Sequence, residues 1–323
     1  MGKQYRIRRL LTSIPVVENN FGTYELPRGY DLESLTLRLR GSVNVTAAGT
    51  VVRADAPCQL IPRVEIVSNG QQTHYSAPFW HAVFLSTIEN SANANQAKAL
   101  CVPPSAASIA NYTIEATGLI NFQTADGERP KDTNLMTAGM SLFTLRLTFG
   151  NGAQLFTGAP TAVFTGFVDV ETTEMVEEVD AQGNRTFPAF IKKVSSQEVD
   201  AVATTTGLEV LLPSGNLFRS VSFRTQLGTG EPGIGILNAA RLESGTDVRA
   251  RIDGPMTIRN NAHRFGWLPT GYYHVDVARN SEFCRLSELW DLRNQAQPKA
   301  VLDVTGAASQ KIQTVITEYI PLA

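Results

Sequence analysis

The sequence predicts an all-β protein built from two tandem β-sandwiches with one or two short helices, and two observations support this prediction. The composition is 43% hydrophobic and only 18% charged, a balance typical of extended strands and short turns rather than of amphipathic helices. In addition, "LPRGYDLESLTLRLR" at 26–40 is echoed by "LPSGNLFRSVSFRT" at 212–225. A sequence repeat of this kind indicates two copies of one structural unit.

The repeat is defined by identities at one constant spacing. Five pairs match 186 positions apart, namely Leu26/Leu212, Pro27/Pro213, Gly29/Gly215, Ser34/Ser220 and Arg38/Arg224. Further on, "LIPRVEIVSNG" resembles "LNAARLESGTD" at a spacing near 176, and Pro78 is matched with Pro255. In each half a strand and a turn are followed by a strand and a Pro-marked bend, which predicts two sandwiches joined near 177–187.

Alternating side chains predict most of the strands. "SLFTLRLTF", "AVFTGFVDVETTEMV", "GYYHVDVA", "KAVLDVT" and "KIQTVITEYI" all alternate with a period of two, and Gly, Asn, Asp and Pro separate them. Helical spacing is found only in "PFWHAVFLSTI" at 78–88 and in "SEFCRLSELWDLRN" at 281–294, where Ser281 is a plausible N-cap. These two segments are the expected helices.

The length of 323 residues suggests two domains. We expect a basic N-terminal arm over 1–20 and a first sandwich over 21–178 with a long loop at about 90–140. A linker region over 179–205 and a second sandwich over 206–323 follow. The loop is expected because the Ala, Ser and Asn-rich stretch after residue 90 is typical of a surface excursion.

The charge of the chain is uneven. The net charge is −2, yet "MGKQYRIRRLL" contains Lys3, Arg6, Arg8 and Arg9 and no acidic residue. Such a segment contacts lipid headgroups or nucleic acid, or is a disordered tail. No signal-peptide core or membrane-spanning stretch is evident, and three widely spaced cysteines favour a reducing compartment.

The sequence contains no pattern that predicts catalysis, a cofactor or a metal site. The four histidines lack metal-ligand spacing, and the glycine-rich "GTGEPGIG" at 228–235 lacks the Lys and Ser/Thr of a phosphate-binding loop. Asp169 and Glu171 could serve glycoside hydrolysis, but alternation places them on a solvated strand face. We expect a protein that is not an enzyme and that uses no cofactor.

A duplicated sandwich with a basic N-terminal segment resembles the double jelly-roll major capsid proteins of tailless icosahedral viruses with an internal membrane, the lineage that includes the adenovirus hexon. The resemblance covers almost the whole chain, and no short motif carries it. It implies two jelly rolls, whose matching early strands are the repeated segments at 26–40 and 212–225.

The resemblance also implies an assembly. Three copies would form a pseudo-hexagonal capsomer of an icosahedral shell and contact neighbouring capsomers and penton or vertex proteins. Lys3, Arg6, Arg8 and Arg9 would point inward, toward the anionic lipid of an internal membrane or toward nucleic acid. The protein would be found in the virion after assembly in the host cytoplasm, with a bacteriophage as the expected source.

Three other functions fit the same sequence. A minor virion protein at a vertex or spike would have the same fold but a lower copy number. A carbohydrate-binding module would use the aromatic cluster formed by Phe265, Trp267, Tyr272 and Tyr273. A double-sandwich hydrolase would depend on Asp169 or Glu171.

Overall fold

The computed structural model describes residues 6–46, 51–85, 101–102, 109–124, 130–157, 161–176, 188–265, 269–280 and 283–322, and these are mostly β-strand. The first half contains the strands β1 (Arg6–Pro15), β2 (Phe21–Glu25), β3 (Asp31–Val45), β4 (Val51–Val52), β5 (Arg63–Ser68), β6 (Gln72–Ala77), β7 (Cys101–Val102), β8 (Ala110–Asn121), β9 (Leu135–Met136), β10 (Phe143–Thr148), β11 (Phe156–Thr157) and β12 (Ala162–Met175).

The second half contains the strands β13 (Phe190–Asp200), β14 (Thr205–Leu211), β15 (Leu217–Gln226), β16 (Leu237–Ser244), β17 (Asp247–Asp253), β18 (Tyr272–Asp276), β19 (Arg279–Asn280), β20 (Phe283–Cys284), β21 (Trp290–Asp291), β22 (Lys299–Val304) and β23 (Lys311–Pro321). The helical segments are η1 (Ala56–Leu60), η2 (His81–Leu85), η3 (Pro130–Thr133), η4 (Gly152–Leu155), α3 (Gly254–Phe265) and η5 (Leu286–Glu288). None of the described helices is long and apolar enough to cross a membrane.

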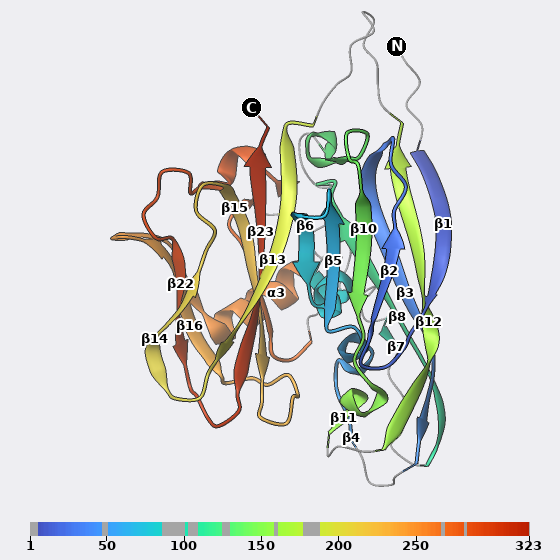
Figure 1. The fold of residues 1–323 in the computed structure, drawn as a ribbon. Helices are drawn as coiled ribbons and strands as arrows, with labels where there is room; N and C mark the ends of the chain where they lie inside the picture. Colours follow the sequence, from blue (N-terminus) through green and yellow to red (C-terminus); the bar gives the residue numbers. More distant parts are fainter. Residues whose placement is uncertain are drawn as a thin grey trace, which may run out of the picture.

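Each half forms two sheets with the same strand order. In the first half, one sheet runs β1-β12-β3-β8 and the other runs β2-β10-β5-β6. In the second half, the corresponding orders are β13-β23-β15-β18 and β14-β22-β16-β17. Figure 1 shows the first sandwich, coloured blue to green, beside the second, coloured yellow to red, with β13 lying between them. The predicted duplication is therefore a duplication of topology.

The pairing register repeats as well, down to its irregularities. The ladder between β3 and β12 passes over Glu33, since Leu32 pairs with Glu174 and Ser34 with Thr173. At the spacing of 186, the ladder between β15 and β23 passes over Arg219 in the same way. A second bulge, at His74 in β6, corresponds to one at Arg249 in β17. Because a bulge is a specific local feature, two matching bulges confirm that the repeated segments are equivalent strands.

The repeated "LPxG" letters have a backbone explanation. Gly29 and Gly215 both have positive φ, at 118° and 86°, a conformation that favours glycine over residues with a side chain. The N–H groups of Leu26 and Leu212 donate to the carbonyls of residues 143 and 298, at the starts of equivalent strands. Each motif thus fixes the entry of the chain into its sandwich.

The two sandwiches differ in how their equivalent strands are buried. β3 alternates between core and solvent over most of its length, whereas β15 is buried along almost its whole length and on both faces. The sheet β13-β23-β15-β18 of the second sandwich turns its outer face toward the first sandwich. Tyr272 and Val315 from this sheet belong to the core of the first sandwich. The chain therefore has two cores in direct contact.

One of the two helix predictions was wrong and the other was right only in part. Residues 283–291 contain β20, η5 and β21, not a helix, because Trp290 pairs with Phe218 of β15 and packs edge-on against its ring. The segment at 78–88 holds a short helix that is π-helical over η2, and its residues 86–88 lie outside the described residues. The longest described helix is α3, in a segment expected to be a bend.

Three predicted ranges also need correction where the structure describes them. The expected arm at 1–20 contains β1, paired with β12, while residues 1–5 lie outside the description. The expected loop at about 90–140 contains β8, whose alternating Ile114, Ala116 and Ile120 are buried in the core. The expected linker at 179–205 contains β13, the first strand of the second sandwich. The predicted bounds 21–178 and 206–323 leave out β1 and β13, and the division of the chain at these positions remains a prediction.

Candidate functional site between the two sandwiches

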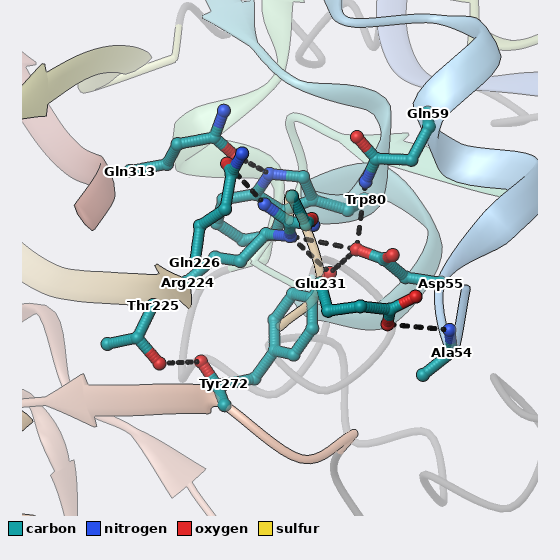
Figure 2. A network of polar contacts seen from close by, with 12 residues as sticks. Ala54, Asp55, Gln59, Trp80, Arg224, Thr225, Gln226, Glu231, Tyr272 and Gln313 are labelled. Carbon is teal, nitrogen blue, oxygen red and sulfur yellow. Dashed lines mark hydrogen bonds and ion pairs between the residues drawn. The ribbon is translucent and has the colours of Figure 1, made fainter. Parts of the chain in front are cut away.

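A buried ion pair joins the two sandwiches. Arg224 on β15 and Asp55, just before η1, are both fully buried, and Nε of Arg224 lies 2.8 Å from Oδ2 of Asp55. Tyr272 on β18 donates its hydroxyl to the same carboxylate oxygen at 2.7 Å. Figure 2 shows these three side chains pointing toward one another from elements of both halves.

The other two nitrogens of the guanidinium each donate a hydrogen bond as well. Arg224 donates to Oε1 of Gln226 and to the carbonyl of Gly230, each within 3.0 Å. Gln59 donates to the Asp55 carboxylate at 2.8 Å. The carbonyl of Gly230 belongs to the glycine-rich segment at 228–235, so Arg224 holds that segment against the contact. An ion pair with this many hydrogen bonds offsets much of its desolvation cost.

The electrostatics keep this group in one charge state. Burial by itself lowers the pKa of Arg224, but the neighbouring Tyr272 and Asp55 outweigh it and raise the pKa above the usual arginine value. Burial, reinforced by the negative charge of Asp55, raises the pKa of the Tyr272 phenol well above its ordinary value. The arginine therefore remains a cation and the phenol remains neutral. The arrangement serves to hold two surfaces together rather than to transfer protons.

Aromatic packing extends the contact. Trp80 of the first sandwich is buried, and its ring meets Tyr272 edge-to-face with centroids 5.3 Å apart. Its indole N–H donates to Oε1 of Gln313 on β23 at 2.9 Å. This side chain thus makes an apolar and a polar contact across the boundary (Figure 2).

The basic residues predicted to contact lipid or nucleic acid lie on β1, except for Lys3, which is outside the described residues. Arg6 pairs with Glu33, Arg8 with Glu171, and Arg9 with the buried Glu174. Three carboxylates therefore balance the three described arginines. Contact of these residues with lipid or nucleic acid remains a prediction from charge alone.

The second sandwich has an ion pair like that of Arg9 and Glu174, which joins the first and last strands of the first sandwich. Lys193 on β13 lies 3.1 Å from the buried Glu318 on β23, and Glu318 occupies the register position of Glu174. In both halves a basic residue of the first strand therefore neutralises a buried glutamate of the last strand. For Arg9, this gives a structural role that the sequence interpretation missed.

The residues considered for other functions are used structurally. Asp169 bonds with Arg40 and Ser13, and Glu171 with Arg8, on one ion-paired strand face. Tyr272 and Tyr273 are buried and so cannot form a sugar-binding platform, while the side chains of Phe265 and Trp267 lie outside the description. Within the described residues, no group of three His, Cys, Asp or Glu side chains could hold a metal ion.

His74 is expected to make stability depend on pH. Burial lowers its pKa from 6.5 to about 4, so between these values the unfolded chain binds a proton that the folded chain does not. The free energy of unfolding therefore loses nothing through His74 above pH 6.5. It falls as the pH drops toward 4, by roughly 2–3 kcal/mol at pH 4.5. Urea unfolding at pH 7 and at pH 4.5 should show a smaller loss in His74→Gln than in the unmodified protein. Equal losses in the two proteins would contradict the prediction.

Comparisons with known proteins were made by sequence and by structure. No protein-family model matches the sequence, and no curated protein matches it. The crystal structure of the MCP of STIV, the Sulfolobus turreted icosahedral virus, is similar to this protein in fold. The match covers 99% of this chain and 97% of the STIV chain, with 13% sequence identity and a TM-score of 0.75. The major capsid protein of bacteriophage PM2 matches 99% of this chain and 98% of its own, with 12% identity and a TM-score of 0.58. The fold is a double jelly roll.

A third solved structure, the capsid of PBCV-1, matches 99% of this chain and 94% of its own, with 12% identity and a TM-score of 0.62. The likeness extends over both jelly rolls and confirms the predicted fold class. In these terms, the Arg224–Asp55 pair and Trp80 connect the first jelly roll to the outer face of the second.

Proposed function

We propose that this protein is a major capsid protein whose homotrimer forms the pseudo-hexagonal capsomers of an icosahedral shell. The observation that carries the proposal is the double jelly roll, shared in fold with the major capsid protein of bacteriophage PM2 and with the capsid of PBCV-1 over 99% of this chain. Fixed contacts between the two jelly rolls support it, because a shell requires a building block of constant shape.

The duplication gives a physical reason for the trimer. Three copies of a chain with two equivalent jelly rolls present six similar sides, so one protein can meet six neighbours in a closed arrangement. The buried Arg224–Asp55 pair holds the two jelly rolls in one orientation, which such a ring requires. Neighbouring capsomers and penton or vertex proteins are the partners that follow. The virion, after assembly in the host cytoplasm, is the proposed location.

A trimer in solution is the expected result of size-exclusion chromatography with light scattering. The species should have a mass of about 105 kDa, three times the 35.1 kDa of one chain. Electron microscopy of the same fraction should show a hexagonal outline. A protein that remains monomeric at high concentration would contradict the capsomer and favour a binding module.

Copy number separates the main alternative. A minor vertex or spike protein would share the fold but occur in few copies per particle, whereas the shell protein would be the most abundant virion component. Quantitative mass spectrometry of purified particles distinguishes the two.

A further inference from the structure

The two jelly rolls within the chain are joined by a strand pair. β13, the first strand of the second jelly roll, lies parallel to β6 at the edge of the first, with Val194 opposite Tyr75. This pair makes one nine-stranded sheet out of a sheet from each half. Figure 1 shows β6 and β13 adjacent at the boundary.

The equivalents of these two strands have open edges. By register, β1 corresponds to β13 and β17 corresponds to β6. Arg8 then occupies the position of Val194, and Ala250 that of Tyr75. Within the described residues, β1 pairs only with β12 and β17 pairs only with β16. Each strand leaves a row of backbone donors and acceptors available for another strand.

The sheet β1-β12-β3-β8 is also more exposed than its equivalent, β13-β23-β15-β18, whose outer face is covered by the first jelly roll. Arg224 on β15 is fully buried by the first jelly roll, whereas its equivalent Arg38 on β3 has a side chain that is 50% exposed. Likewise Lys192 on β13 is buried, and its equivalent Arg6 is exposed. The first jelly roll thus presents a face and an edge of the kind that the second has buried within the chain.

We propose that β1 of one copy pairs in parallel with β17 of a second copy, with Arg8 opposite Ala250, and so repeats the β6–β13 junction between chains. The inference rests on the proposed trimer and identifies its contact. If the second junction has the geometry of the first, three internal and three intermolecular junctions alternate around a closed ring. Addition of a strand to an open edge is an established mode of association.

The charges on the two edges are compatible with this pairing. β17 contains Asp247, Arg249, Arg251 and Asp253 and is neutral overall. The arginines of β1 are balanced by carboxylates of their own jelly roll. Neither edge therefore carries a net charge that would repel the other.

Cysteine cross-linking tests the pairing. The variant Arg8→Cys/Ala250→Cys, confirmed as a trimer by light scattering, should give covalent dimers and trimers as its main products after mild oxidation, seen on a non-reducing gel. Each single variant should remain monomeric on that gel, which controls for the native cysteines. A second control is Phe21→Cys/Ala250→Cys, since Phe21 is 71% exposed on β2, at the other open edge of the first jelly roll.

The outcomes separate the two proposals. Cross-linking several-fold above all controls supports the β1–β17 pair. A trimer in which the double variant cross-links no more than the controls overturns the pair and leaves the capsomer proposal intact. A protein that is only monomeric overturns the capsomer proposal and, with it, this contact.

Discussion

Arg224→Ala should lower the free energy of unfolding by about 3–5 kcal/mol, because it leaves the Asp55 carboxylate buried without its cation. The substitution also removes the donors to Gln226 and to the carbonyl of Gly230. Guanidinium denaturation, followed by far-ultraviolet circular dichroism, measures the loss. Because Arg224 connects the two jelly rolls, the unfolding transition should also become less steep.

The duplication supplies a matched control. Arg38 occupies the equivalent register position and pairs with Glu115 at 2.6 Å, but both side chains are more than one-third exposed. An exposed pair of this kind contributes at most about 1 kcal/mol, so Arg38→Ala should have a small effect. Similar losses for the two variants would show that burial at the boundary does not give Arg224 its importance.

The repeat was readable in the sequence because the backbone imposes it at specific residues. The "LPxG" glycines need positive φ, and the strands that follow need buried side chains at alternate positions. The match of Pro78 with Pro255 was less accurate. The pairing registers of the two halves make residue 76 equivalent to residue 251, so the equivalent of Pro78 is Asp253. Sequence similarity alone could not correct a two-residue error where few letters are shared.

The missed helix shows the limit of apolar periodicity. α3 begins at "GPMT", where Gly-Pro is a turn signal, and its Met256 and Ile258 are exposed rather than buried in a stripe. The available signal was Asp253, whose side chain accepts from the N–H of Met256 as an N-cap does. In the segment 281–294 the apolar residues have helical spacing, but Trp290 packs on Phe218 and this contact favours extended structure.

The site could not be predicted in the same way. Asp55 and Arg224 are far apart in the sequence, and nothing local distinguishes Arg224 from its equivalent Arg38. The difference arises only when one jelly roll covers the other. Similarly, the arginines of the N-terminal segment were interpreted as free charges because their partners Glu33, Glu171 and Glu174 lie on strands that are distant in sequence.

Trp80→Ala should lower the free energy of unfolding by about 3–5 kcal/mol, the usual cost of removing a large buried aromatic side chain. The substitution leaves a cavity next to Tyr272 and removes the donor to Gln313 on β23. Thermal unfolding by calorimetry, together with guanidinium denaturation, measures the effect.

Trp290 is the matched comparison, because it is also buried but packs on Phe218 inside the second core. Trp290→Ala should cause a similar loss with a single transition, since it weakens one jelly roll and leaves their contact unchanged. Trp80→Ala weakens the contact itself, so the two jelly rolls should unfold in separate steps. If Trp80→Ala instead unfolds in one sharp transition, the boundary is held mainly by the β6–β13 strand pair and the Arg224 network, and the aromatic contact is secondary.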